Sequence, residues 1–123
     1  MTKTINLGVL GIDHGHIFDM LDEMLKEGCS CNYFWTEGSP LTLDEFSKKY
    51  PQIKRVDNKS DILNDDAIDM ILISSIPKDR ANLSIDAMKA GKDVMVDKPG
   101  CTTLEQLNYL KQTVKDTGKI WSI

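Results

Sequence analysis

A loop containing two histidines and an aspartate follows the first apolar run of the chain. Residues 11–16 have the sequence GIDHGH. A dinucleotide-binding fingerprint places one glycine at a tight turn, a second where the backbone meets the pyrophosphate, and a small residue where the helix packs on the strand. Gly11 meets the first requirement, whereas Asp13 stands at the second position and His16 at the third. The sequence therefore predicts a phosphate-binding turn with only one of its three small residues.

Asp13 leaves several interpretations of this loop open. A carboxylate about 4 Å from a phosphate charge repels it by about 1–4 kcal/mol, and free helix amides offset a comparable amount. Asp13 could instead be the N-cap of the next helix, accepting from the amide of Gly15 or His16. His14 and His16 could contact a substrate or phosphate in their charged form. We expect no metal, because such a turn rarely points Asp13, His14 and His16 at one ion and no fourth ligand is evident.

A second carboxylate follows the next predicted strand. Glu37 lies about 21 residues after His16, where an acidic residue binds the ribose 2′-hydroxyl in dinucleotide sites. The same carboxylate would repel the 2′-phosphate of NADP. Glu37 therefore favours NAD over NADP.

The most specific pattern is the run ILISSIPKDRANLSIDAMKAGKDVMVDKP at residues 71–99. It contains Ser74, Ser75 and Pro77 after one predicted strand, Ala90-Gly91-Lys92 after a helix, and Asp97-Lys98-Pro99 after the next strand. This pattern resembles the Gfo/Idh/MocA family of NAD(P)-dependent oxidoreductases. In that family a strand ends in a Ser/Thr-x-Pro loop, the next helix closes with Ala-Gly-Lys, and the following strand runs into Glu-Lys-Pro.

The resemblance implies roles for several residues. Lys98 takes the position of the family's catalytic lysine, which contacts the substrate hydroxyl and the nicotinamide and would help to neutralise a developing alkoxide. Asp97 is one methylene shorter than the usual glutamate, Arg80 stands where many relatives carry histidine, and Pro99 is expected to follow a cis peptide bond. The residues expected to contact NAD or NADP are Gly11, Asp13, His14, His16, Glu37, Ser74, Ser75, Pro77 and Asp97.

Strands and helices alternate along the whole chain. Apolar runs predict strands over about 4–10, 31–36, 55–56, 68–74 and 94–96, and a last strand from about 120. Helical spacing of apolar residues, with Gly or Pro at the ends, predicts helices over about 17–27, 42–50, 60–63, 77–90 and 103–117. Capping boxes are predicted at Thr42 with Glu45 and at Thr102 with Glu105.

This alternation predicts an α/β fold, a doubly wound three-layer sandwich around a mostly parallel, Rossmann-like sheet. Ligands of such sheets bind beyond the carboxyl ends of the strands, where the strand order reverses. The loops at 11–16, 35–38, 74–77 and 97–100 are therefore expected around one crevice.

Composition limits the classes of function. The chain has 123 residues and a net charge of −4, which fits one domain and offers no basic surface for nucleic acid. Its apolar runs are too short to span a membrane, and its first residues lack the order of a signal peptide. Together with three cysteines, for which no catalytic role is expected, this predicts a cytoplasmic protein.

Two functions remain open. In the first, residues 1–123 are the nucleotide-binding domain of a dehydrogenase that acts on a sugar, a polyol or a related hydroxyl compound, with the dinucleotide and this small molecule as its partners. The resemblance then implies a C-terminal domain, absent from this chain, that carries the substrate pocket and a homo-oligomer interface, so the isolated domain would be inactive. In the second, the chain is a Rossmann-fold binding or structural module that has lost the dinucleotide.

Overall fold

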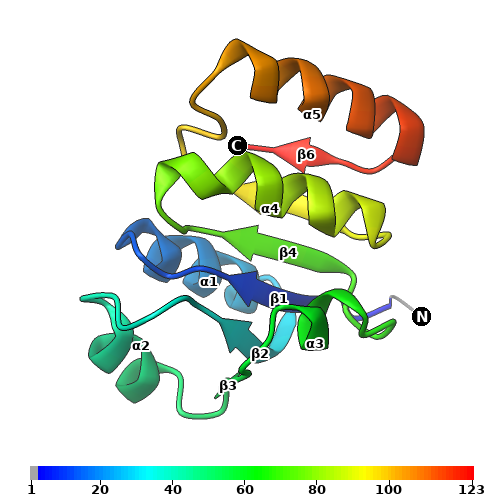
Figure 1. Ribbon diagram of the computed structural model, residues 1–123. Helices are drawn as coiled ribbons and strands as arrows, with labels where there is room; N and C mark the ends of the chain where they lie inside the picture. Colours follow the sequence, from blue (N-terminus) through cyan, green and yellow to red (C-terminus); the bar gives the residue numbers. More distant parts are fainter. Residues whose placement is uncertain (1–2) are drawn as a thin grey trace.

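The computed structural model describes residues 3–123 and contains one parallel sheet with helices on both faces (Figure 1). The elements are β1 (Asn6–Leu10), α1 (His16–Lys26), β2 (Ser30–Trp35), α2 (Leu43–Lys49), β3 (Lys54–Arg55), α3 (Ser60–Leu63), β4 (Met70–Ile73), α4 (Pro77–Lys89), β5 (Asp93–Val96), α5 (Leu104–Thr117) and β6 (Trp121–Ser122). The predicted alternation is confirmed, including the short β3 and α3. No helix within residues 3–123 combines the length and the apolar character that crossing a bilayer would require.

The strand order is β3-β2-β1-β4-β5-β6, and every neighbouring pair is parallel. From β1 the chain builds outward to β3 and then returns to place β4 on the other side of β1. Leu10, at the end of β1, lies opposite Ile73, at the end of β4. The order therefore reverses between these two strands, and their following loops emerge side by side, as the predicted doubly wound fold requires.

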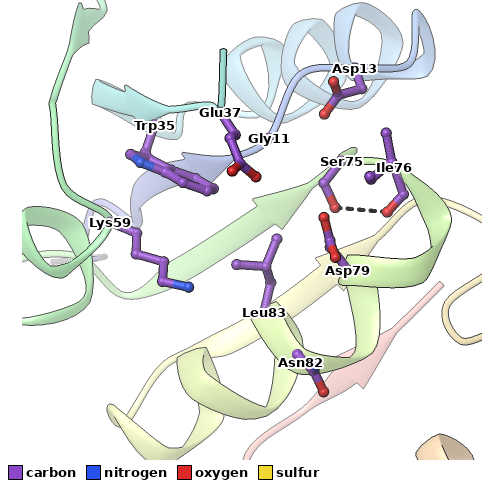
Figure 2. A pocket seen from close by; sticks show the side chains of 10 residues that line it. All are labelled: Gly11, Asp13, Trp35, Glu37, Lys59, Ser75, Ile76, Asp79, Asn82 and Leu83. Atoms are coloured by element: carbon purple, nitrogen blue, oxygen red, sulfur yellow. Dashed lines mark hydrogen bonds between the residues drawn. The ribbon is translucent and has the colours of Figure 1, made fainter. Parts of the chain in front are cut away.

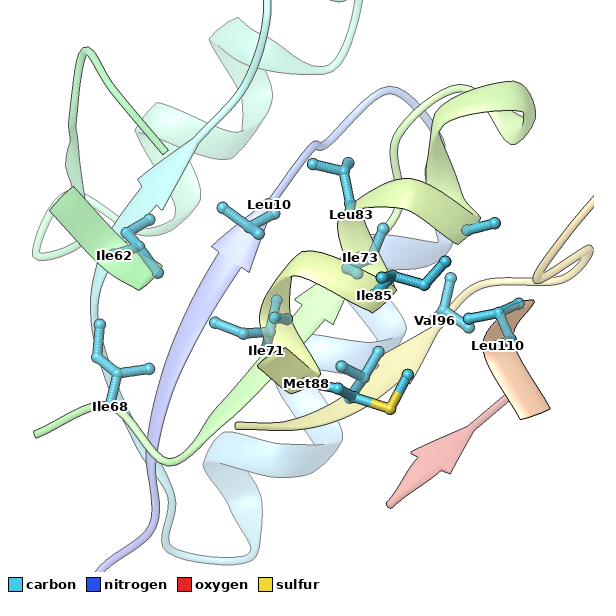
Figure 3. Close-up of a cluster of buried hydrophobic side chains, with 13 residues drawn as sticks. Leu10, Ile62, Ile68, Ile71, Ile73, Leu83, Ile85, Met88, Val96 and Leu110 are labelled. Carbon is cyan, nitrogen blue, oxygen red and sulfur yellow. The ribbon is translucent and has the colours of Figure 1, made fainter. Parts of the chain in front are cut away.

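Successive strand residues point to opposite faces and build two cores. Leu7, Val9 and Leu72 pack with α1 and α2 in one cluster. Ile71 and Ile73 face the other way, into a cluster that α3, α4 and α5 cover (Figure 3). Burial on both faces explains why the central strands are continuously apolar.

The helix caps differ from the predicted capping boxes. The hydroxyl of Thr42 donates to a carbonyl in the β1–α1 loop and makes no cap for α2. At α5, Thr103 Oγ1 accepts from the amide of Gln106 (3.0 Å), and Gln106 Oε1 accepts from the amide of Thr102 (2.7 Å). The box therefore lies one residue later than predicted, because Thr103 is the residue that keeps extended backbone angles next to the helix.

Candidate functional site

A cavity of about 310 Å³ lies at the carboxyl ends of β1, β2 and β4, where the strand order reverses (Figure 2). The cavity is lined by the loop after β1, the end of β2 with the loop that follows it, the residue before α3, and the loop after β4 with the first half of α4. The lining residues are Gly11, Asp13, Trp35, Glu37, Lys59, Ser75, Ile76, Asp79, Asn82 and Leu83. This volume is in the range of small-molecule sites. The loops after β1, β2 and β4 meet here as predicted, but the loop at 97–100, expected at the same crevice, contributes no residue to this lining.

Gly11 forms the floor of this cavity. Its φ of +88° is one that residues with a side chain rarely adopt. A Cβ atom at this position would lie 2.5 Å from Ser75 Cβ and 2.8 Å from Ser75 Cα. The amide of Gly11 donates to the carbonyl of Trp35 (2.7 Å), and its carbonyl accepts from the amide of Ser74 (3.2 Å). Gly11 therefore brings the loops after β1, β2 and β4 into direct contact.

Asp13 lies half-buried on the wall of the cavity, facing the start of α4 (Figure 2). Burial raises the pKa of its carboxyl, while hydrogen bonds from the backbone amides of Asp13 and Ile76 oppose this shift. The interpretation of Asp13 as the N-cap of α1 is wrong: the cap residue is Gly15, which has no side chain to offer, and the amide of His16 donates to His14 Nδ1 (3.1 Å). Asp13 lies two residues before this cap, and its side chain lines the cavity.

Glu37 follows the end of β2 and points into the same cavity (Figure 2). The guanidinium of Arg55 fixes its loop by donating to the carbonyls of Thr36 (3.0 Å) and Gly38 (2.7 Å). The side chain of Glu37 is exposed, so it can reach a ligand without losing a protein partner.

Several lining residues were missed from the sequence. Trp35, at the end of β2, is half-buried and lines the cavity. The ammonium of Lys59 lies 5.7 Å from the centre of the Trp35 ring. Asp79 adds a third carboxylate from the first turn of α4. The position of Trp35 at the end of β2 was the available signal, whereas Lys59 and Asp79 carry no sequence motif.

A second group of polar residues lies on the β5 side of the switch point. His16 Nδ1 is 2.9 Å from Asp97 Oδ1, and His14 Nδ1 is 3.4 Å from Asp97 Oδ2. Both imidazoles are about half-exposed, and Asp97 is buried. Burial favours the neutral form of Asp97, but the His16 hydrogen bond and the charge of Arg80 outweigh it, so the pKa of Asp97 lies below its usual value.

Arg80 is buried beneath this group and holds the loop after β5. Its guanidinium donates to the carbonyls of Ser75 (2.7 Å), Asp97 (3.2 Å) and Lys98 (2.7 Å), and it lies 3.6 Å from the Asp97 carboxylate. Arginine at this position therefore ties the ends of β4 and β5 together. The Lys98–Pro99 bond is cis, as the resemblance predicted.

Lys98 lines a shallow cavity of about 290 Å³ together with His16, Asp19 and Asp97. Ser74 lies buried between this cavity and the first one, with its hydroxyl near the His14 carbonyl (3.2 Å) and Asp97 Oδ2 (3.3 Å). The lysine is exposed at the mouth of the cavity. A ligand oxygen entering there would meet the ammonium of Lys98, the imidazole of His16 and the carboxylates of Asp19 and Asp97.

The predicted site residues thus form two groups on either side of the end of β4. Gly11, Asp13, Glu37 and Ser75 line the first cavity. His14, His16, Ser74, Asp97 and Lys98 gather at the second, through the contacts given above. Pro77 begins α4 as an exposed residue and lines neither cavity.

The thiols take no part in either group. Burial raises the pKa of Cys31 to about 12, so it is a neutral core side chain. Cys29 packs beside the α1 and α2 cluster, and Cys101 beside the other.

Comparison with known proteins gives one family match. Residues 38–123 match the family model GFO_IDH_MocA, described as an oxidoreductase family with an NAD-binding Rossmann fold. The match covers more than half of the chain and includes the Ser-Ser-Ile-Pro and Asp-Lys-Pro segments.

Two curated proteins and one crystal structure extend this match over the whole chain. The scyllo-inositol 2-dehydrogenase (NADP(+)) IolW of Bacillus subtilis is 25% identical over 98% of the chain and 33% of its own length. The uncharacterized oxidoreductase YdgJ of Escherichia coli is 34% identical over 100% of the chain and 35% of its own length. The structure of a putative oxidoreductase from Erwinia carotovora atroseptica superposes with a TM-score of 0.93 at 30% identity, covering 97% of this chain and 35% of that one. The chain therefore spans about a third of the length of these relatives.

Proposed function

Because the chain belongs to the Gfo/Idh/MocA family of oxidoreductases with an NAD-binding Rossmann fold, we propose that the larger of the two cavities described above, which Gly11, Glu37 and Ser75 line, binds a nicotinamide dinucleotide. The observation that carries this proposal is the cavity between Gly11, Glu37 and Ser75 at the reversal of strand order, the position where Rossmann-like sheets bind ligands. The chain is in this proposal the nucleotide-binding part of a dehydrogenase.

The residues present fit a dinucleotide at the ribose. Glu37 can accept hydrogen bonds from ribose hydroxyls. At the start of α1 the amides of residues 16–18 already donate to His14 and Gly15, so the helix dipole is what favours an anion there. Asp13 opposes the anion unless its carboxyl is protonated or turned away, and its raised pKa lowers the cost of protonation. The fit is therefore good at the ribose and costly at the pyrophosphate.

NAD fits this cavity better than NADP. Asp13, Glu37 and Asp79 place three carboxylates around it, and Lys59 is the cation in its lining. A 2′-phosphate beside Glu37 would meet a like charge. The relative from B. subtilis is named for NADP(+), so the cofactor is a point on which the two proteins can differ.

Lys98 is the residue we assign to the reaction. A dinucleotide held by Gly11, Glu37 and Ser75 would supply a hydride acceptor for the carbon that carries the substrate hydroxyl, and the hydroxyl proton would leave to water. The ammonium of Lys98, exposed at the mouth of the second cavity, can stabilise the negative charge that develops on that oxygen. A polyol or sugar is the proposed substrate class, supported by the name of the inositol dehydrogenase relative.

Titration calorimetry of the chain with NAD, NADH, NADP and NADPH tests the proposal. We expect saturable binding of NAD or NADH at micromolar to sub-millimolar concentration, weaker binding of the phosphorylated forms, and loss of binding in Glu37→Ala. Glu45→Ala is the matched control, because Glu45 is an exposed carboxylate on α2 outside the cavity.

The three carboxylates favour a second candidate, a module that has lost the dinucleotide. Asp13→Gly removes both the charge and the bulk, and Asp13→Asn removes only the charge. If the native chain binds no nucleotide at millimolar concentration and Asp13→Gly does bind it, the cavity is a dinucleotide site that has lost its affinity through Asp13. Silence in the native chain and in both variants would overturn the cavity as a dinucleotide site.

A further inference from the structure

The cluster of His14, His16 and Asp97 has a composition that dinucleotide binding does not require. One atom from each of these three side chains lies within 4.8 Å of the other two. The sequence argued against a metal because such a turn rarely points Asp13, His14 and His16 at one ion and no fourth ligand is evident. In the structure Asp13 lines the other cavity. Asp97, 81 residues from His16, takes its place beside the two histidines.

Main-chain hydrogen bonds fix His14 and Asp97 to two adjacent residues at the end of β4. The amide of His14 donates to the carbonyl of Ser74 (3.1 Å), and the amide of Asp97 donates to the carbonyl of Ile73 (2.9 Å). Ser74 is fully buried. The ligand atoms are therefore brought together by the main chain, at little further cost in conformational entropy.

The spacing of these atoms suits one metal ion. Zinc binds imidazole nitrogens and carboxylate oxygens at about 2.0–2.2 Å, so neighbouring ligand atoms of a tetrahedral site lie roughly 3.4 Å apart. The observed distances are 2.9 Å from His16 Nδ1 to Asp97 Oδ1 and 3.4 Å from His14 Nδ1 to Asp97 Oδ2, the other oxygen of the same carboxylate.

His14 Nδ1 has two neighbours in this cluster. It accepts from the amide of His16 (3.1 Å) through its single lone pair. It also lies 3.4 Å from Asp97 Oδ2. A metal ion between the ring and the carboxylate would take the same lone pair, so binding exchanges the His16 hydrogen bond for a metal–nitrogen bond.

We propose that His14, His16 and Asp97 bind a divalent first-row transition-metal ion, such as zinc or cobalt. Two imidazoles and one carboxylate leave at least one coordination position open, toward the cavity that Lys98 lines. Arg80 lies 3.6 Å from the same carboxylate and opposes the cation, so the expected affinity is micromolar. A substrate oxygen could complete the coordination; this last role rests on the proposed dehydrogenase function, whereas metal binding does not.

The test is titration of the chain with Zn²⁺ and, separately, Co²⁺, without nucleotide. All variants carry Cys29→Ser and Cys101→Ser, so that the two partly exposed thiols do not bind the metal. We expect one equivalent to bind, a rise in Tm, and a cobalt absorption spectrum of nitrogen and oxygen ligands.

Three variants locate the site. His14→Ala and His16→Ala each replace a half-exposed ring. Both are expected to weaken metal binding by more than about tenfold, because mutation of a residue that only hydrogen-bonds a metal ligand already costs about tenfold in metal affinity. Glu23→Gln is the matched control, an exposed carboxylate further along α1 that lines neither cavity and leaves the affinity unchanged. Absence of saturable binding, or equal binding in all three, would overturn the proposal. Nucleotide titration of the same variants shows separately whether the dinucleotide proposal fails.

Discussion

Gly11 is the single residue on which the shape of the larger cavity depends most. Its positive φ and its contact with Ser75 are two independent reasons to exclude a side chain. The sequence predicted the first from the tight turn of the fingerprint. The contact with Ser75 was not predictable, because it depends on how closely β1 and β4 are joined.

Gly11→Ala is expected to lower the free energy of unfolding by about 2–4 kcal/mol, the sum of backbone strain and a collision with Ser75. Gly15→Ala is the control, since Gly15 has a φ of −62° and a Cβ there would meet nothing within 4 Å. Urea unfolding of both variants checks this. Equal stability of the two variants would contradict the role given to Gly11.

Asp97 shows at the residue scale what the sequence left open: it predicted that the loops at 11–16 and 97–100 come together, but not which of their side chains touch. The sequence marked His14, His16 and Asp97 as candidates one by one, and each lies where its strand or loop was expected. Their mutual contact depends on the pairing of β4 with both β1 and β5. No local pattern expresses that order.

At the scale of elements, apolar periodicity predicted the longer strands and helices to within a few residues, because buried faces impose it. The short β3, Lys54–Arg55, has no buried residue and carries no such pattern. The caps were predicted less well. Thr42 and Thr103 are both threonines before a helix, yet only Thr103 has the extended backbone angles of a cap. Those angles are set by the preceding loop, which carries no periodic pattern.

Asp69, the residue before β4, gives a prediction about how the free energy of unfolding depends on pH. Asp69 accepts from the amide of Asn6 (2.9 Å) and from Lys3 Nζ (2.7 Å), and these bonds hold its pKa below the usual value. A lowered folded-state pKa means stabilisation that is present above about pH 4, the unfolded value, and is lost as the pH falls through the folded value.

Asp69→Ala should therefore cost about 1 kcal/mol at pH 7, and the difference from the native chain should shrink toward zero in strong acid. Urea unfolding at several pH values measures it. Asp44→Ala, which removes an exposed ion pair on α2, is expected to cost less than about 0.5 kcal/mol at every pH. A difference for Asp69→Ala that is constant with pH would contradict the assignment.

At the scale of the whole molecule, the sheet is continuous while the helices form two separate cores. Trp35 lies at the end of β2 and Trp121 in β6, so the two tryptophans of the chain belong to opposite halves of the strand order, although both pack against the core cluster under α4. Because β1, β4 and β5 contribute to both faces, we expect the halves to unfold together.

Trp35→Phe and Trp121→Phe each leave one tryptophan. In each variant, fluorescence and far-ultraviolet circular dichroism should give the same urea midpoint. A fluorescence transition that precedes the dichroism transition in one variant would show that one half of the sheet unfolds independently.

The end of β4 has one more consequence. Ser75 faces the larger cavity, and Ser74, its neighbour in the chain, holds His14 and Asp97 at the smaller one. A molecule in the larger cavity would contact Ser75, and one in the smaller cavity would contact Asp97, whose carboxylate lies 3.3 Å from Ser74 Oγ. The two binding sites are thus supported by one short stretch of main chain at the end of β4.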